Sequence, residues 1–466
     1  MAGSNSFGTP GMPTDRRASL GVPASAMSNF RSARRELPLD MNKLRLIFAD
    51  RRDDFDLGDL VLPGLVDSGE AKLHRLLSLL LTKRFLEAGH RLCAALTDES
   101  EVLLLQSLVE GFQRLPDSVM LATVARPEVA SWIFLVREAL QDGSAVSLEG
   151  MVHHLVGFLI GPLAAHDCLE IGWTGWMTPS RNDMIDIGLS SVELSIGRKV
   201  SGPVGVTRTG VGLALADCAG PVIEISLPFT LPIQQNREGT HWVQKPRLPN
   251  NGPVILRRNA WYEQFFPRDR LSRASPIYFG ITDDEFSNFC VSISSGAKLV
   301  HQYWPEAWRE IASRIRTVAP LRTSGLQPHN ASVHAFRGLI TTSARPGYLS
   351  AQTLVHETGH NTFSSICDVF TLFQGQTEPT AYSPFVKTQR PVSAVAHGIF
   401  SFLQDIHMSI RLQGKVSQIG TLSIERYIDT SRKSVKIALD NLKGACSFTD
   451  RGEQLIHGFE RALGTT

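Results

Sequence analysis

The sequence predicts an α+β fold in which a strand-rich middle part separates two helical parts. Apolar residues recur at spacings of three and four over about residues 39–165, in a helical N-terminal part assigned to 39–179, and again over 283–466, which is the period of helices packed on one face. Residues 180–282 instead combine glycines and prolines with short alternating apolar runs, as in strands joined by turns. The 466 residues suffice for two or three domains or for one large multilayer fold.

The composition of the chain is that of an ordinary globular protein. The chain is 42% hydrophobic and 20% charged with a net charge of +2, so its charge favours neither nucleic acid nor membrane as a partner. Its six cysteines are scattered without a C-x-x-C pair, which indicates a reduced, intracellular protein. The N-terminus has no apolar core of the secretory kind, and the longest apolar run, residues 155–165, is too short to span a bilayer. We expect a cytoplasmic protein.

Residues 1–38 are predicted to form a disordered basic leader. They are rich in Gly, Ser, Pro and Ala, with several arginines, and cannot bury enough apolar area to offset the entropy of ordering. A passive leader is favoured over one that grips an acidic partner.

Within the first helical part, apolar periodicity predicts helices over about 73–92 and 102–112 and a third that opens at Pro127. His153 and His154 lie on a further apolar helix. Adjacent helical residues point about 100° apart and do not face one metal together, so these two are interpreted as core or surface histidines.

The middle part contains four candidate strands, at residues 184–188, 210–215, 221–225 and 252–256. Their glycines match no phosphate-binding loop pattern, so we assign them to turn geometry.

The last part begins with a helix for which Asp283 is the predicted N-cap. Residues 319–347 are predicted to be a mixed loop and residues 375–382 another loop. Two amphipathic helices, about 421–444 and 450–463, complete the chain.

The most informative stretch is a His-Glu-x-x-His motif, His356-Glu357-Thr358-Gly359-His360, in an apolar helix with Ser350 as its predicted N-cap. Two imidazoles four residues apart lie on one helical face, about 5–6 Å apart, and can share a metal ion. Glu357 is then placed to handle protons on a metal-bound water. Polar groups on so apolar a helix are costly unless they are paired, so a metal centre is favoured over two satisfied core histidines.

Several residues are candidates for the third protein ligand of this centre. One peptidase class requires Gly and His where this chain has Phe363 and Ile366, so that class is excluded. Glu378 lies eighteen residues beyond His360 but in a loop, which is a weak peptidase signal. Asp368 is about 12 Å along the same helix, too far to share the metal, so it is assigned a structural role.

His397 is a stronger candidate because it lies on the following helix, which a short connection can lay against the motif helix. Arg390 precedes it by about two turns and can bind a carboxylate in the same cavity. The alternative for Arg390 is an ordinary surface or helix-terminal salt bridge.

Five sequence elements together resemble one family. In order, they are the Leu354-Val355-His356-Glu357-Thr358-Gly359-His360 stretch, Cys367-Asp368-Val369, Tyr382-Ser383-Pro384-Phe385, Arg390-Pro391-Val392 and His397-Gly398-Ile399-Phe400. The family is that of the HExxH-motif peptide-modification proteins, found with ribosomally made peptide natural products. Some members are described as 2-oxoglutarate-dependent peptide β-hydroxylases. The resemblance covers about residues 41–412.

The resemblance implies that iron(II) is bound by His356, His360 and a third ligand, His397, with Arg390 and Tyr382 at the 2-oxoglutarate site. The expected reaction uses 2-oxoglutarate and O2 to hydroxylate a side-chain Cβ of a ribosomal precursor peptide. Non-haem iron oxygenases usually use two histidines and one carboxylate, so Glu357 stays an alternative third ligand.

Two other functions stay open. The runner-up is a zinc-dependent metallopeptidase with Glu357 as base on a metal-bound water. The third is a non-catalytic peptide-binding protein with a structural metal, which would need a closed, four-coordinate site.

Overall fold

A computed structural model describes residues 56–464, with gaps. The gaps are residues 65–66, 143–146, 181–183, 190–191, 197–199, 201, 217–222, 227–240, 258, 267–276, 279–280, 324–329 and 376. The fold is α+β, as predicted, with helices at both ends and several sheets in the middle. The predicted leader, residues 1–38, lies outside the described residues.

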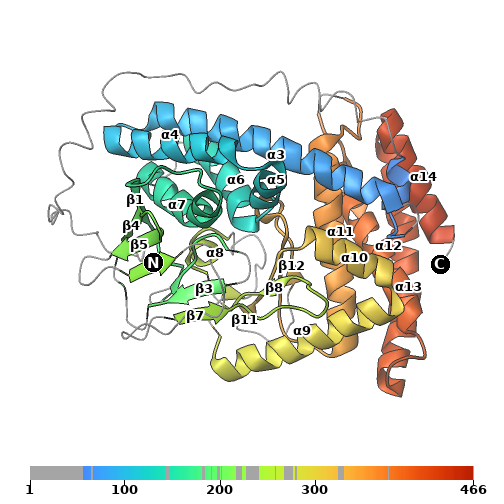
Figure 1. The fold of residues 1–466 in the computed structure, drawn as a ribbon. Helices are drawn as coiled ribbons and strands as arrows, with labels where there is room; N and C mark the ends of the chain where they lie inside the picture. Colours follow the sequence, from blue (N-terminus) through green and yellow to red (C-terminus); the bar gives the residue numbers. More distant parts are fainter. Residues whose placement is uncertain are drawn as a thin grey trace, which may run out of the picture. The chain divides into compact units, whose positions relative to one another are not determined.

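The first helical part packs around aromatic side chains. Its elements are η2 (Leu57–Leu60), α3 (Asp67–Ala95), α4 (Glu99–Arg114), α5 (Asp117–Val124), α6 (Pro127–Asp142) and α7 (Leu148–Ala165). The ring of Phe85 lies 4.4 Å from that of Phe112 and 5.5 Å from that of Trp132. The long helix α3 packs against α6 and also reaches the motif helix α11 (Gly347–Val369), so it connects the two helical parts (Figure 1).

Helix α7 is a core helix. By length and composition alone it is the one described helix able to cross a membrane, or one of two if the bent pair α5–α6 counts as a single span. In this fold 67% of the 18 residues of this helix are buried. His153 of this helix contacts Glu101 at 2.9 Å, and His154 packs edge-on against Trp261. His153 is half-buried and His154 is buried, which agrees with their interpretation as core or surface histidines.

Two antiparallel sheets form the middle part. One has the strand order β1-β4-β5-β6 and the other β2-β3-β7. The strands are β1 (Thr174–Met177), β2 (Met184–Ile185), β3 (Val192–Ser195), β4 (Val204–Arg208), β5 (Gly212–Ala216), β6 (Ile223–Ser226) and β7 (His241–Gln244). Strand β1 lies inside the part predicted to be helical, so that boundary was wrong. The helical spacing itself ends near residue 165, and a strand of four residues is too short to give a clear alternating pattern.

A third sheet was predicted only at residues 254–255, which lie within the candidate strand 252–256. It has the order β12-β13-β10-β8, and most of it lies in residues 319–347, predicted to be a loop. Its strands are β8 (Val254–Ile255), β10 (Thr317–Pro320), β12 (Asn330–Ala331) and β13 (Leu339–Thr342). Strand β13 pairs parallel to β10 and antiparallel to β12. Every residue of β10 and β13 is buried, so neither strand shows the alternation that marks a strand in sequence.

Four short elements remain in this part of the chain. They are α8 (Ala260–Phe265), β9 (Ile277–Tyr278), which pairs with β11 (Arg322–Thr323), and η3 (His334–Phe336).

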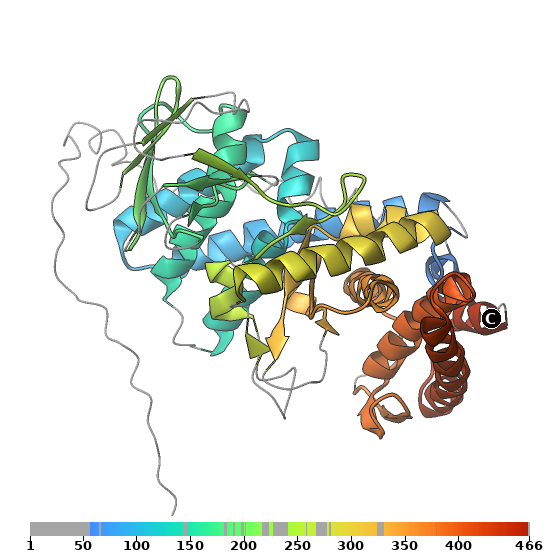
Figure 2. The same ribbon diagram turned by 90° about the horizontal axis from the view of Figure 1, so that it is seen from below.

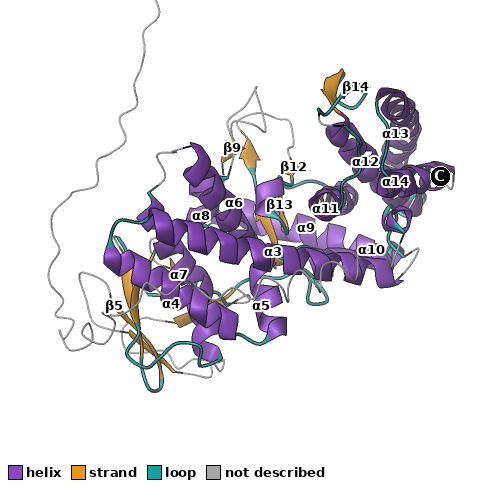
Figure 3. Cartoon of the chain, turned by 90° about the horizontal axis from the view of Figure 1, so that it is seen from above, coloured by secondary structure: helices purple, strands orange, loops and turns teal. Residues whose placement is uncertain are grey.

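The C-terminal part is a group of long helices with one hairpin. The further helices are α9 (Asp283–Tyr303), α10 (Pro305–Arg314), α12 (Val392–Leu412), α13 (Gln418–Ala445) and α14 (Asp450–Gly464). Motif helix α11 packs between α9 and α12, and α12 packs against α13 and α14 (Figure 2). The hairpin β14 (Thr380–Ser383) and β15 (Thr388–Pro391) lies beside α12 and α13 (Figure 3).

Three local predictions in this part were wrong. Thr282, rather than Asp283, caps α9 in a capping box with Glu285. Helix α11 starts at Gly347, so Ser350 lies inside it, with its hydroxyl 3.2 Å from the carbonyl of Arg345. Residues 380–382 of the predicted loop belong to β14, because pairing with β15 supplies hydrogen bonds that the local sequence does not reveal.

Candidate metal centre

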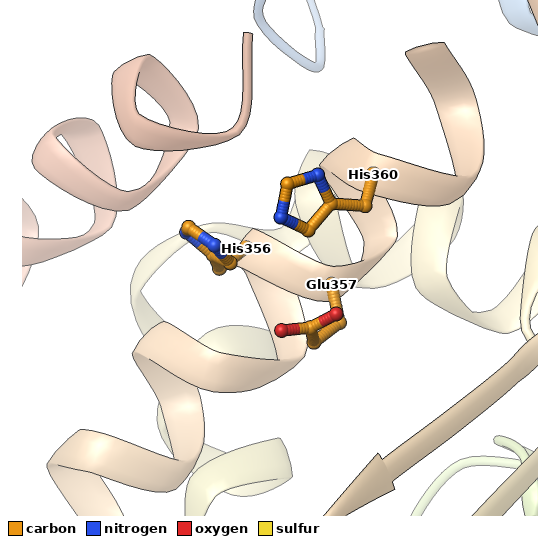
Figure 4. A group of neighbouring side chains, drawn as sticks. All are labelled: His356, Glu357 and His360. Atoms are coloured by element: carbon orange, nitrogen blue, oxygen red, sulfur yellow. The ribbon is translucent and has the colours of Figure 1, made fainter. Parts of the chain in front are cut away.

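Helix α11 brings the three motif side chains together. One potential ligand atom from each of His356, Glu357 and His360 lies within 4.8 Å of the others. The two imidazole rings are 4.7 Å apart and nearly perpendicular. Figure 4 shows the His360 ring with one nitrogen directed toward His356 and Glu357 and the other directed away. Within the part of the chain that the structure describes, this is the group of His, Cys, Asp and Glu side chains with metal-binding geometry.

Side chains of α12 lie next to Nδ1 of both motif histidines. Nδ1 of His360 lies 2.8 Å from Oγ of Ser401. Nδ1 of His356 lies 3.4 Å from Oδ2 of Asp405, but it has no hydrogen-bond partner among the described residues. With Nδ1 hydrogen-bonded to Ser401, the imidazole of His360 presents Nε2 as its free ligand atom.

The two oxygens of Glu357 have different surroundings. Oε1 accepts a hydrogen bond from Nδ2 of Asn330, while Oε2 is buried and has no hydrogen-bond partner among the described residues. An unpaired buried carboxylate oxygen is costly, and a cation beside it removes the cost. Two imidazoles and a carboxylate are donors that suit zinc or iron(II). The residues present therefore fit a divalent transition-metal ion.

The pKa shifts of the three motif residues differ in direction. Burial, together with the charges of His397, His356 and Arg390, holds the pKa of His360 well below its usual range, so its imidazole is neutral. Burial raises the pKa of Glu357, although His356 and Asn330 oppose this shift. For His356 burial would lower the pKa, but the carboxylates of Asp405 and Glu357 outweigh it and the net shift is upward.

His397 lies next to the centre but outside the gathered group. Its Nε2 is 3.0 Å from the backbone oxygen of His360, and its ring stacks on Phe363. The His397 and His360 rings are 4.4 Å apart. Burial lowers the pKa of His397 to about 4, against the effect of its hydrogen bond to His360.

The hairpin carries the two residues expected at the 2-oxoglutarate site. Arg390 is exposed on β15, opposite Ala381, and its charge lowers the pKa values of both His360 and His397. Tyr382 on β14 is 40% exposed. Arg390 is thus within electrostatic reach of the centre, while Tyr382 lies on an exposed face of the hairpin.

The two other acidic residues considered from sequence, Glu378 and Asp368, make contacts away from the motif side chains. Oε1 of Glu378 accepts a hydrogen bond at 2.7 Å from the backbone N of Ser393, in the first turn of α12. Asp368 forms ion pairs with Arg84, at 3.1 Å, and with Arg337. This agrees with the structural role expected for Asp368.

Sequence reasoning missed five polar residues around the centre: Asn330, Ser332, Arg345, Ser401 and Asp405. Ser332 donates a hydrogen bond to the backbone oxygen of Glu357 at 3.0 Å, and Nη2 of Arg345 donates to Oδ1 of Asn330 at 3.1 Å. One signal was available, because Ser401 and Asp405 follow His397 at four-residue steps and so share its helical face.

No protein-family model and no curated protein matches this chain. The resemblance to the HExxH-motif peptide-modification family therefore stays an expectation from the sequence elements.

Proposed function

We propose that this protein is an iron(II)- and 2-oxoglutarate-dependent oxygenase of the HExxH-motif peptide-modification type, which hydroxylates a side-chain Cβ in a ribosomally made precursor peptide. The observation that carries the proposal is the gathering of His356, His360 and Glu357 within 4.8 Å. Two histidines and one carboxylate with open positions are the ligand set of non-haem iron(II) oxygenases.

Each residue has a role in this proposal. His356 and His360 bind iron through Nε2, and the unpartnered Oε2 of Glu357 is the third protein ligand. The guanidinium of Arg390, near His360 and His397, binds the distal carboxylate of 2-oxoglutarate. When bound, iron would activate O2, which is the oxidant: one oxygen atom would enter the new hydroxyl and the other would enter succinate, as 2-oxoglutarate loses CO2.

The competing function is a zinc peptidase with Glu357 as base on a metal-bound water. Glu378, its best candidate for a third ligand, hydrogen-bonds the first turn of α12 instead. The carboxylate-binding role available to Arg390 also has no necessary place in peptide hydrolysis. Both observations favour the oxygenase.

The test of the proposal needs no peptide. Iron(II) is added to metal-free protein without oxygen, 2-oxoglutarate is titrated in, and the visible spectrum is followed. We expect a saturable metal-to-ligand charge-transfer band that requires both components and is absent in His356→Ala. No band in the wild type, together with tight zinc binding, would contradict the oxygenase and favour the peptidase.

The same titration tests Arg390. We expect Arg390→Ala to bind 2-oxoglutarate about tenfold or more weakly while iron affinity is unchanged, since a charge-assisted hydrogen bond contributes about 1.5–3 kcal/mol. Arg426→Ala, an exposed arginine on α13, is the matched control. Unchanged 2-oxoglutarate affinity in Arg390→Ala would remove this residue from the site.

A further inference from the structure

Helix α12 presents one polar face to the metal-binding motif. His397, Ser401 and Asp405 follow one another at four-residue steps, and each contacts a different atom of the two motif histidines. The close approach depends on Gly359, because a Cβ there would lie only 3.2 Å from the Cα of Ser401. The two helices are therefore held at a separation at which short side chains of α12 reach the imidazoles.

These contacts select a ring tautomer. The carboxylate of Asp405 lies 3.4 Å from Nδ1 of His356 without a hydrogen bond between them, and its negative charge favours the form of His356 in which Nδ1 carries the proton. The hydroxyl oxygen of Ser401, at 2.8 Å, can accept from Nδ1 of His360. Both imidazoles then keep the Nε2 lone pair available for a metal ion.

Asp405 is in turn positioned by a residue of α13. Its side chain is buried, with 6% of the residue exposed, and Oδ2 accepts a hydrogen bond from the hydroxyl of Tyr427 on α13. Its other oxygen, Oδ1, is buried and has no hydrogen-bond partner among the described residues. A buried carboxylate kept with so few partners is costly to the fold, which indicates that its charge serves the neighbouring imidazole.

We infer that Ser401, Asp405 and Tyr427 are positioning residues that orient the two imidazoles and set the metal affinity of the centre. The inference rests on the metal binding included in the proposed function, but it holds equally for iron and zinc. A chain of contacts then runs from α13 through α12 to the metal ligand on α11. Packing of the C-terminal helices would thereby be coupled to metal affinity.

The experiment compares metal binding in four full-length, metal-free variants. They are Asp405→Asn, Tyr427→Phe, Ser401→Ala and the matched control Asp429→Asn, which removes an exposed charge two residues from Tyr427. Cobalt(II) is titrated as a spectroscopic probe, and zinc affinity is measured by competition with a chelator. We expect Asp405→Asn to lose about 10–100-fold in affinity, as for other outer partners of metal-bound histidines, and to shift the cobalt d–d bands. We expect smaller losses in Tyr427→Phe and Ser401→Ala, and none in the control.

The outcomes separate the inference from the proposed function. A wild-type protein that takes up no divalent metal would overturn both. Tight binding by the wild type, with equal affinity and an identical cobalt spectrum in Asp405→Asn, would overturn the positioning role alone. If the role of Asp405 were purely structural, Asp405→Asn would lower the melting temperature of the metal-free protein without shifting the cobalt d–d bands. If Asp405→Asn does not fold, Ser401→Ala decides by the same two readouts.

Discussion

At the scale of single residues, Glu357 illustrates how neighbours define a ligand. Nδ2 of Asn330 donates a hydrogen bond to Oε1 of Glu357, and Arg345 donates one to Oδ1 of Asn330. The second oxygen is left buried and unpaired beside two imidazoles. The ring of His397 lies 4.4 Å from that of His360, about as close as the ring of His356. However, Nε2 of His397 contacts the backbone oxygen of His360. The contacts therefore favour Glu357 over His397 as the third protein ligand.

This ranking leads to a test with three variants of matched shape. We expect Glu357→Gln to weaken iron(II) binding by more than about 100-fold, because losing a ligand costs more than losing its outer partner. His397→Gln should cost about tenfold or less. Glu378→Gln keeps an oxygen for the hydrogen bond to Ser393, and we expect wild-type affinity there. Calorimetric titration gives all three affinities. Loss of binding in His397→Gln with full binding in Glu357→Gln would reverse the assignment.

At the scale of elements, the crossing of α9 and α11 fixes the position of the motif helix. Gly296 of α9 lies directly over Ser350 and Ala351 of α11, and both helices are buried along this line. A Cβ at position 296 would lie 2.6 Å from the Cβ of Ser350 and 2.7 Å from the backbone N of Ala351. Backbone atoms of a buried helix cannot yield as a flexible side chain can, so the helices must separate to admit it.

We expect Gly296→Ala to lower the free energy of unfolding by about 1–3 kcal/mol, the usual cost of overpacking, despite the better helix propensity of alanine. Gly444→Ala is the control. Gly444 lies in α13 with nothing within 4 Å of an added Cβ, so there alanine should stabilise the fold by about 0.5–1 kcal/mol. Urea denaturation measures both. A stabilised Gly296→Ala would contradict the close packing of α9 on α11.

At the scale of the whole molecule, buried neutral histidines link stability to pH. Outside the candidate centre, burial lowers the pKa values of His74, His154 and His407 to about 4, from the usual 6.5. The unfolded chain therefore binds more protons than the native chain between about pH 4 and 6.5. Stability is fully present above pH 6.5 and falls as the pH drops through this window.

We expect the free energy of unfolding of the metal-free protein to fall between pH 6.5 and 4.5. Each such histidine contributes a slope of up to about 1.4 kcal/mol per pH unit. His407→Gln keeps a donor for the carbonyl of Ala462 and should reduce the slope by roughly one histidine's share. The exposed His90→Gln should leave it unchanged. Equal slopes in wild type and His407→Gln, measured by denaturant unfolding at several pH values, would contradict this account.

The features that the sequence by itself determined are local. A helical period in apolar residues placed α3, α6, α13 and α14 within a few residues of their observed bounds, and the four-residue spacing within the motif placed two imidazoles on one face. The order of helical, strand-rich and helical parts also followed from such local periods. Each of these periods is a local signal, because helix geometry relates a residue to neighbours only three or four positions away.

Only the tertiary structure decided which distant residues complete the centre. Asn330 reaches Glu357 because β12 pairs at the edge of a sheet whose buried strands carry no alternating pattern. Asp405 reaches His356 because Gly359 lets α12 approach α11. Both contacts depend on how elements pack, and packing is set by the summed burial of many side chains rather than by any local period. The motif could therefore be recognised in the sequence, whereas the distant residues that contact its side chains could not.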